Sequence, residues 1–350
     1  MTPPADPAPS EVPGIRADAV RDWLTAHVAD VTPPLRFELI TGGRSNLTFR
    51  VTDAKGRGLV LRRPPLGAIL ATAHDMGREH RIQSALANSG VPVPPILGLC
   101  DDESVNDAPF YVMEYVPGHV LTDPESAATL LPDRAERHAL GLRVIDVLAD
   151  LHRVRPADVG LGDLGRTEAY LARQLKRWKR QWDDSKTREL PAMEEAHARL
   201  TERIPEQQAA AIVHGDFRLG NLIVRGREVR AVLDWELCTL GDPLADVAYL
   251  MNDWADPSDP LPTVSAGGSP SQAGGFPTRD ELLERYAART GFDLSGIAFY
   301  RAFQYWRAAA IVEGVMARYL KGVMGDENDP EPMRRGIDRC AAAAITLLDA

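Results

Sequence analysis

The sequence predicts an α+β fold with two lobes, in which a small lobe built on an antiparallel sheet precedes a larger helical lobe. Before residue 117 the chain contains short apolar runs separated by turn residues, which is typical of antiparallel strands. After residue 118 the apolar residues recur at helical spacing over long segments. The chain has 350 residues, which is enough for two such lobes. We expect the lobes at residues 15–116 and 117–350, after a disordered arm at residues 1–14.

The composition argues against several classes of protein. An apolar content of 44% and a charged content of 26% are typical of a soluble globular chain. The net charge of -10 argues against nucleic acid as a partner, because phosphate binding requires basic surfaces. Cys100, Cys238 and Cys340 are isolated, which fits a reducing compartment and argues against a structural zinc site.

The termini and hydropathy predict a cytoplasmic protein with no membrane partner. Residues 1–14 are rich in proline and acidic residues and lack the features of a signal peptide. No apolar run reaches the length of about 18 residues that a membrane span requires. The sequence leaves the oligomeric state open.

The small lobe is expected to begin with a helix over residues 15–28, whose apolar residues share one face. A second helix over residues 71–87 ends at Asn88-Ser89-Gly90. Strands are expected where apolar runs are bounded by turn residues, at 37–40, 47–51, 59–61, 96–100 and 110–115.

The large lobe is expected to be helical. Periodic apolar segments predict helices at residues 133–151, 167–182, 194–204, 244–254, 279–289, 299–320 and 333–348. Residues 255–278 are dense in proline, glycine and serine and are too long for a tight connection. We predict that they form a flexible loop.

The centre of the chain carries a motif that suits phosphoryl transfer. His214-Gly215-Asp216 follows a short apolar run, Asn221 lies five residues after the aspartate, and Asp234 follows the next apolar run. Transfer to a hydroxyl needs a residue that orients the hydroxyl and accepts its proton, together with oxygen ligands for Mg²⁺. We predict Asp216 as the catalytic base and Asn221 and Asp234 as the metal ligands. The protein kinase catalytic loop has the same spacing, so the predicted fold is protein-kinase-like.

Each of these residues also has a simpler explanation. Asp216 alone would as often be a turn residue bonded to its own backbone, and the other two residues a cap and a strand-end carboxylate. Their combined spacing favours the functional interpretation. We interpret His214 as a residue that holds the loop in place, and Asp242 and Asp246 as helix caps that brace it.

Two stretches of the small lobe suit a nucleotide, which we expect to be ATP. The glycine-rich loop between the first two strands carries Gly43, Ser45 and Asn46, where backbone amides could face phosphates. A plain hairpin turn fits this loop equally well. The fifth strand leads to the junction of the lobes, where adenine would bind backbone groups near Glu114 and Val116.

A cation that binds the phosphates is expected at the end of the third strand. The sequence offers Arg62 or Arg63 there and no lysine. Strand alternation puts Arg62 on the face of Val60, and Glu79 on the following helix is its natural ion-pair partner. The alternative is an exposed surface pair that contributes little. We favour Arg62 with Glu79.

These motifs resemble those of the aminoglycoside phosphotransferase and choline kinase-like superfamily. They are closest to the kinase-like domains of acyl-CoA dehydrogenase family members ten and eleven. The resemblance is carried by Val60–Pro65, Ala73–Asp75, Val159–Gly162, Tyr170–Leu175 with Trp178, Gln181 and Trp182, and Gly220–Asn221 through Asp234–Leu237.

The resemblance implies a bilobal kinase-like fold that uses ATP and Mg²⁺. It also implies transfer of the γ-phosphate to a hydroxyl of a small-molecule substrate, which in the closest branch is a hydroxyacyl-CoA. Arg62 stands where many members of the superfamily have lysine. Because arginine binds phosphate as a planar fork, the choice between ATP and GTP stays open.

The helix expected at residues 167–182 is unusually basic. Its cluster comprises Arg166, Arg173, Lys176, Arg177, Lys179 and Arg180. These side chains could hold an anionic substrate such as a CoA tail, or they could form a solvated basic face. An aminoglycoside pocket would instead need clustered carboxylates.

Three other functions fit parts of the sequence. Arg62 in place of lysine suits a catalytically weak, nucleotide-binding regulatory protein. A kinase acting on an aminoglycoside-like or amino-alcohol substrate would use the same catalytic motif. His214, Asp216 and Asp234 could serve a metal-dependent hydrolase, but the sequence lacks the additional histidines of a zinc site.

Overall fold

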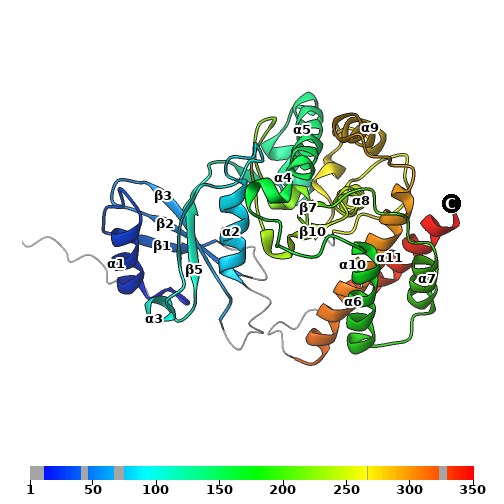
Figure 1. Cartoon of the computed structure of the whole chain (residues 1–350), viewed down its shortest axis with the longest axis horizontal. Helices are drawn as coiled ribbons and strands as arrows, with labels where there is room; N and C mark the ends of the chain where they lie inside the picture. The colour runs from blue at the N-terminus through cyan, green and yellow to red at the C-terminus, as the bar shows by residue number, and fades with distance from the viewer. Residues whose placement is uncertain (1–11, 41–45, 67–74, 266, 323–328) are drawn as a thin grey trace, which may run out of the picture. The chain divides into compact units, whose positions relative to one another are not determined.

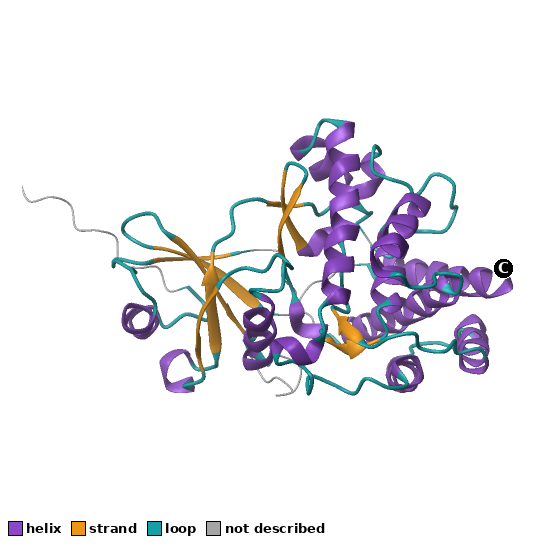
Figure 2. Cartoon of the chain, turned by 45° about the horizontal axis from the view of Figure 1, so that its top comes forward, coloured by secondary structure: helices purple, strands orange, loops and turns teal. Residues whose placement is uncertain are grey.

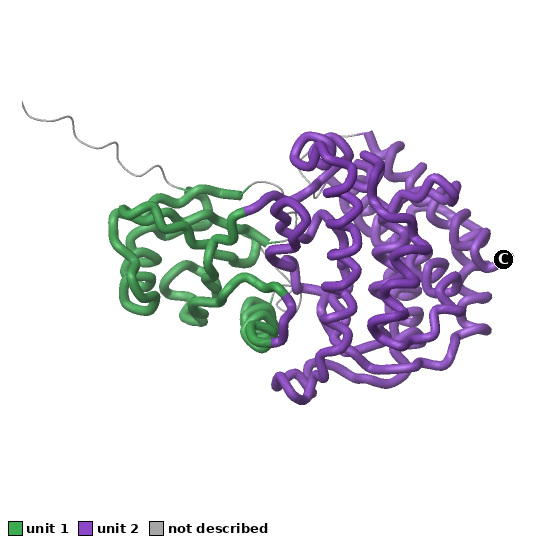
Figure 3. Tube along the Cα trace, turned by 90° about the horizontal axis from the view of Figure 1, so that it is seen from above, with its two compact units in different colours: residues 1–88, 92–117 green, residues 89–91, 118–350 purple. Residues whose placement is uncertain are grey.

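The computed structural model describes residues 12–40, 46–66, 75–265, 267–322 and 329–350 (Figure 1). Gly43 and Ser45, predicted to contact phosphates, lie outside these ranges. The chain divides into two compact units, coloured separately in Figure 3. Unit 1 comprises residues 1–88 and 92–117, and unit 2 comprises residues 89–91 and 118–350.

Unit 1 is built on a five-stranded antiparallel sheet in the order β1-β2-β3-β5-β4. The strands are β1 (Arg36–Leu39), β2 (Leu47–Thr52), β3 (Gly58–Arg63), β4 (Ile96–Cys100) and β5 (Phe110–Glu114). The helices are α1 (Ala17–His27), α2 (Met76–Leu86) and α3 (Glu103–Asn106).

The sheet of unit 1 is buried on both faces because successive side chains of a strand point to opposite sides. Leu61 of β3 belongs to the apolar core that contains Leu24 of α1. Val60, its neighbour in β3, packs in a separate cluster with Met76 of α2. Arg62 therefore emerges on the side of the sheet that α2 covers.

Unit 2 is mainly helical, as the purple ribbons of Figure 2 show. Its helices are α4 (Pro124–Leu130), α5 (Arg134–Arg153), α6 (Tyr170–Ser185), α7 (Pro191–Glu202), α8 (Leu244–Asp253), α9 (Arg279–Thr290), α10 (Ile297–Leu320) and α11 (Glu331–Asp349). The long helix α10 packs against α6, α7, α8 and α11, so it forms the centre of this unit.

Two small antiparallel sheets complete unit 2. β7 (Ala211–Val213) pairs with β10 (Thr239–Gly241). β6 (His119–Val120), β8 (Leu222–Arg225) and β9 (Glu228–Val232) form the other sheet in that order. The segments that join these strands carry the predicted catalytic motif.

The strands and helices predicted from apolar spacing occur with their ends shifted by a few residues. The predicted start of α2 falls outside the described residues, and the described helix begins at Met76 after an Asp75 cap. The sequence pattern does not predict α3 and α4, because they are short and depend on the side-chain caps Asp102 and Asp123.

The segment predicted as a flexible loop, residues 255–278, contains some packed structure. Its 3-10 turn spans Pro270–Ala273. Ser269, which precedes the turn, and Ser271, which lies within it, are both buried. Ser265 donates a hydrogen bond to the carboxylate of Asp253 at the end of α8. The flexibility of the segment stays a prediction.

Candidate active site

The strands of unit 2 bring the three predicted catalytic residues to one region. The loop of Asp216 begins where β7 ends. The pairing of β8 with β9 puts Asn221, which precedes β8, beside Leu233, which follows β9. The amide of Leu233 donates to the carbonyl of Asn221 at 2.8 Å, and Asp234 comes next in the chain.

Asn221 fixes the conformation of the loop that carries Asp216. Its Nδ2 donates to the carbonyl oxygen of Asp216 at 2.8 Å and to Oδ2 of the same residue at 2.7 Å. Both protons of the amide nitrogen are therefore used, which leaves the amide oxygen for another partner. Asn221 is 7% exposed, so this arrangement is shielded from water.

The loop requires glycine at position 215. Gly215 has a φ of +88°, and a Cβ there would lie 2.9 Å from Cβ of Leu237. Its amide donates to Oδ1 of Asp246 at 2.8 Å, and its carbonyl accepts from Nη2 of Arg307 at 3.1 Å. Both polar backbone groups of this residue are thus held by buried side chains.

His214 joins the loop of Asp216 to the turn before Asp234. Its Nδ1 accepts from the amide of Asp216 at 3.2 Å, and its Nε2 donates to the carbonyl of Leu233 at 2.9 Å. These bonds require a proton on Nε2 and none on Nδ1. The contacts agree with the predicted role of a residue that holds the loop.

Asp246 anchors the loop of Asp216 to α8. Its carboxylate accepts from the amides of His214 and Gly215 at 2.6 and 2.8 Å, and lies 3.3 Å from Nε2 of His152. Burial acts to raise the pKa of Asp246, but the hydrogen bond and charge of His152, together with the loop contacts, hold that pKa below its ordinary value. The carboxylate form is therefore favoured in the folded protein.

The prediction that Asp246 caps a helix is wrong, because this residue lies within α8. Asp242, which precedes the helix, accepts from the amide of Leu244 at 3.1 Å and from the hydroxyl of Tyr300 at 2.7 Å. Burial raises the pKa of Asp242. Asp242 therefore bonds the start of α8, while Asp246 braces the loop.

Asp234 adopts a backbone conformation that is uncommon for a residue with a side chain. Its φ of 66° and ψ of 64° lie in the left-handed region. Such strain persists only where the surrounding structure imposes it, and it concentrates at functional positions. The strained backbone of Asp234 is therefore consistent with a functional position.

In unit 1, the predicted pair of Arg62 and Glu79 forms. Nε of Arg62 lies 3.0 Å from Oε2 of Glu79, and the Glu79 side chain is 2% exposed. Asn46 and Tyr111 donate to the two oxygens of Glu79 at 3.0 and 2.9 Å. The pair is therefore buried and networked, which excludes the alternative of an exposed surface pair.

Arg63 has a different role from Arg62. Its Nη1 donates to the carbonyl oxygens of Gly14 and Asn106 at 2.7 and 3.0 Å. Burial lowers the pKa of Arg63. These contacts make Arg63 a structural residue and leave Arg62 as the candidate cation of β3.

Glu114 ends β5, the last strand of unit 1, and Val116 follows two residues later. The Glu114 amide donates to the carbonyl of Pro95 at 2.9 Å, and its carboxylate pairs with Arg57 at 2.5 Å. In the part of the chain that the structure describes, the Val116 amide has no backbone acceptor. Adenine contacts at this pair of residues remain a prediction.

Comparison with known proteins identifies the family. The sequence pattern of the phosphotransferase enzyme family matches residues 36–303. The chain belongs to this family.

The relatives of this phosphotransferase include proteins named acyl-CoA dehydrogenase family members. The chain is 41% identical over 313 residues to member 10 of Mus musculus, covering 88% of the chain and 29% of that protein. It is 38% identical over 300 residues to member 11 of Gallus gallus, covering 83% of the chain and 38% of that protein. The chain thus spans well under half of the length of these relatives. The resemblance drawn from the sequence is confirmed.

Solved structures share the fold of this phosphotransferase. One is a Ralstonia eutropha protein whose name assigns it to the aminoglycoside phosphotransferases, with 35% identity and a TM-score of 0.79. The match covers 94% of this chain and 98% of that chain. The macrolide 2'-phosphotransferase MphH of Brachybacterium faecium has 20% identity and a TM-score of 0.60, over 93% and 98% of the two chains. The predicted α+β kinase-like fold is confirmed.

Within the described residues of the phosphotransferase, no helix combines the length and apolar character of a membrane span.

Three side chains of the phosphotransferase that the sequence does not single out surround Asp216. Nε of Arg218 lies 3.5 Å from Oδ1 of Asp216. The hydroxyl of Tyr249 is hydrogen-bonded to Asp216. Burial and the negative charge of Asp216 raise the pKa of Tyr249 well above its ordinary value. Burial raises the pKa of Asp253 to about 6, although Ser265 and Arg218 oppose the shift. Tyr249 and Asp253 are four residues apart on α8, so they share a helix face. This four-residue spacing is the feature by which the sequence could have indicated the two residues.

Arg307 is the other functional candidate that the sequence analysis missed. It lies in α10 at 6% exposure and donates to the carbonyl of Gly215 and to Oε1 of Gln304. Its guanidinium lies over the rings of Trp178 and Tyr249, 5.3 and 5.8 Å from their centroids. A single arginine within an apolar helical stretch was the signal, because a buried charge needs specific partners.

Proposed function

We propose that this phosphotransferase is a small-molecule kinase that transfers the γ-phosphate of ATP to a hydroxyl group of its acceptor. The observation that carries the proposal is that Asn221 bonds both the side chain of Asp216 and the backbone of Leu233, the residue before Asp234. The family to which the chain belongs supports phosphoryl transfer as the reaction.

Asp216 is the proposed catalytic base. As the acceptor oxygen forms its bond to the γ-phosphorus, the bond from that phosphorus to the ADP oxygen breaks, and the hydroxyl proton passes to the carboxylate. Asn221 donates to Oδ2 of Asp216, and Arg218 lies near Oδ1. These contacts orient the carboxylate before the acceptor binds, so positioning and electrostatics supply most of the catalysis.

Asn221 and Asp234 are the proposed ligands of Mg²⁺. An amide oxygen and a carboxylate are suitable donors, because Mg²⁺ is bound by a few protein oxygens together with substrate phosphates and water. The nitrogen of Asn221 is occupied by Asp216, so its oxygen is the atom available to the ion. Bound Mg²⁺ would neutralise charge on the transferring phosphates.

The alternative of a zinc-dependent hydrolase has less support. A zinc site is built mainly from three or four histidine, cysteine or acidic ligands. Across the described ranges of the chain, no group of three such residues is arranged to hold a metal. His214 also has both ring nitrogens in contact with backbone groups.

Arg62 is the proposed cation for the nucleotide phosphates. Glu79 holds its Nε side, and an arginine carries further donors that can face phosphate oxygens. Backbone groups of Glu114 and Val116 are the proposed adenine contacts. Guanine can also bind backbone groups, so the proposal includes GTP as the alternative donor.

The proposed acceptor is a hydroxyacyl-CoA. The relatives that the chain matches at 41% and 38% identity carry names that refer to acyl-CoA. Arg177 and Arg180 of the basic helix α6 suit the anionic phosphates of such a molecule. An aminoglycoside-like or amino-alcohol acceptor would bring positive charge to the same helix, which disfavours it electrostatically.

The test is formation of ADP and of a phosphorylated product with a panel of hydroxyacyl-CoAs, aminoglycosides and amino alcohols. We expect product with the hydroxyacyl-CoAs, and none when Asp216→Asn replaces the wild type. Asp101→Asn is the matched control, because Asp101 is exposed in unit 1. Phosphorylation of an aminoglycoside alone would contradict the acceptor, and equal rates in the Asp216→Asn variant would contradict the base.

The second candidate is a nucleotide-binding regulatory protein with weak catalysis. Arg62 in place of the usual lysine motivates it, since the two cations bind phosphates with different geometry. Calorimetry with ATP and Mg²⁺, followed by the turnover assay, separates the two candidates. Tight binding without any phosphorylated product would favour the regulatory protein.

A further inference from the structure

A basic groove lies between α6 and α10, two helices that run side by side in unit 2 (Figure 1). Its cavity volume is about 440 Å³, within the range of about 300–1,000 Å³ that small-molecule sites occupy. The charged residues that line it are Arg177, Arg180 and Asp184 from α6 and Arg318 and Lys321 from α10 and its end. We call this feature the α6/α10 groove.

The α6/α10 groove carries an excess of positive charge. Four of its side chains are cationic and one is acidic, in a chain whose net charge is -10. Among the ion pairs of the described residues, none includes Arg177, Arg180, Arg318 or Lys321. The four cations therefore lack carboxylate partners in the described structure.

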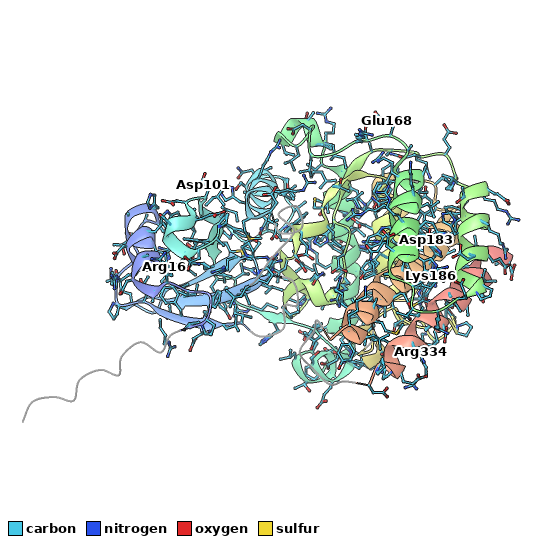
Figure 4. The ribbon with its side chains drawn as sticks, turned by 90° about the horizontal axis from the view of Figure 1, so that it is seen from below. Arg16, Asp101, Glu168, Asp183, Lys186 and Arg334 are labelled. Carbon is cyan, nitrogen blue, oxygen red and sulfur yellow. The ribbon has the colours of Figure 1, made fainter. Side chains whose placement is uncertain are left out.

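Two cations near the groove, on α6 and directly after it, are neutralised by carboxylates. Lys179 pairs with Asp183 at 2.6 Å and with Glu194 at 3.2 Å. Lys186 pairs with Glu189 at 2.9 Å. Figure 4 labels Asp183 of this helix and Lys186, the residue that follows its end. These two cations beside the groove are thus neutralised, whereas the four that line it are not.

Arg177 lies close enough to Arg307 for the two positive charges to repel each other. Loss of water around its guanidinium and the positive charge of Arg307 both lower the pKa of Arg177. Arginine nevertheless stays protonated in proteins, so the two like charges persist side by side. An anion bound at this point would relieve that repulsion.

Trp178 contacts both a cation of the α6/α10 groove and the arginine that holds the loop of Asp216. The guanidinium of Arg177 lies over the ring of Trp178, 5.2 Å from its centroid, and Arg307 lies over the same ring at 5.3 Å. Arg307 in turn donates to the carbonyl of Gly215, directly before the proposed base. One aromatic ring therefore separates the groove from the residue that holds the catalytic loop.

We propose that the α6/α10 groove binds the phosphate groups of the acceptor, which is therefore a small molecule that already carries two or more phosphates. The assignment rests on the proposed function, because it presumes an acceptor whose hydroxyl reaches Asp216. Several unpaired arginines suit this ligand, since each can bind phosphate oxygens through two parallel hydrogen bonds.

Calorimetry tests the binding without catalysis. The probe is adenosine 3',5'-bisphosphate, with the nucleotide site filled by AMP-PNP and Mg²⁺, and adenosine is the uncharged control ligand. We expect the bisphosphate to bind and adenosine not to bind. The double variant Arg180→Gln, Arg318→Gln should weaken bisphosphate binding on the order of tenfold or more, because charge-assisted phosphate contacts are among the stronger hydrogen bonds.

Lys176→Gln provides the matched control, since Lys176 is an exposed cation of the same helix and does not line the groove. It should change the bisphosphate affinity less than twofold, by the small effect of an exposed surface charge. Wild-type protein that fails to bind the bisphosphate would overturn the proposal. So would an equal loss of affinity in the control and in the double variant.

Kinetics test whether the bound phosphates belong to the acceptor. In the double variant, the KM of a phosphate-bearing acceptor should rise on the order of tenfold while kcat and the KM of ATP stay near wild type. An unchanged acceptor KM, with bisphosphate binding lost, would overturn the assignment to the acceptor. If the wild type phosphorylates no acceptor, the proposed function is wrong, and so is the assignment of the groove to the acceptor. Calorimetry would still show whether the groove binds the bisphosphate.

Discussion

The side-chain nitrogen of Asn221 donates to both the backbone carbonyl and the carboxylate of Asp216, at 2.8 and 2.7 Å. One residue therefore closes the loop and holds the carboxylate of the proposed base, and its side-chain oxygen is left for another ligand. The five-residue spacing of the two residues matters because it lets this bond form across the short 3-10 turn Leu219–Asn221.

Replacement of Asn221 by alanine should reduce kcat by about 100-fold or more, because it removes a proposed metal ligand and releases Asp216. The Mg²⁺ concentration for half-maximal rate should rise as well. Initial rates over a Mg²⁺ titration measure both effects, and circular dichroism checks that the variant is folded. A folded variant with an activity within twofold of wild type would rule out the role of Asn221.

Gly215→Ala should abolish most activity and destabilise the protein by about 1–3 kcal/mol, because it adds a Cβ in a left-handed conformation against Leu237. Gly226→Ala is the matched control. Gly226 also has a positive φ, of +57°, but no atom lies within 4 Å of an added Cβ. We expect the control to lose about 1 kcal/mol and to keep its activity. Equal activity in the two variants would contradict the account of the loop.

Arg62→Gln should destabilise unit 1 by about 3 kcal/mol, because Glu79 would become a buried charge without its cation. Arg57→Gln is the comparison, since Arg57 and Glu114 form a pair that is 27% and 33% exposed. Its loss should change stability by about 1 kcal/mol or less. Thermal unfolding without nucleotide measures both variants. A smaller effect for Arg62→Gln than for Arg57→Gln would contradict the buried network.

Asp253 predicts a pH dependence of stability. Burial raises its pKa from 3.8 to about 6, so between these values the folded state binds the proton more tightly than the unfolded state. Stability therefore declines as the pH rises through this window, by on the order of 3 kcal/mol, and stays lower above it. Asp253→Asn should be more stable than wild type at pH 7.5 and equal to it near pH 4. A variant that is less stable at pH 7.5 would show that the carboxylate is needed in its charged form.

The sequence predicts the residues of the candidate site better than the residues that hold them in place. The pairing of Arg62 with Glu79 follows from strand alternation and helix order, and the structure confirms it. The spacing of Asp216, Asn221 and Asp234 follows from the chemistry that they would perform together. These relationships join residues that are close in the chain or that lie on consecutive strands and helices. They therefore appear in the sequence as regular spacing.

Long-range relationships leave no such trace. Arg307 lies 92 positions from Gly215, to which it donates. An arginine in an apolar stretch indicates a buried charge, but the sequence does not indicate that Gly215 is its partner. The same holds for the approach of α10 to α6, which creates the α6/α10 groove. The predicted basic cluster on α6 was therefore only part of the relevant surface. Its partners on α10 become visible when the helices are packed.

The central claim is that Asp216 accepts the proton of an acceptor hydroxyl during transfer of the γ-phosphate. The most direct measurement is transfer of labelled γ-phosphate from ATP to a hydroxyacyl-CoA by wild type, Asp216→Asn and the Asp101→Asn control, with AMP-PNP affinity as a check on the fold. Wild type and the control should form the labelled product. The Asp216→Asn variant should bind AMP-PNP normally and transfer at least about 1,000-fold more slowly. Labelled product at the wild-type rate from Asp216→Asn would contradict the account.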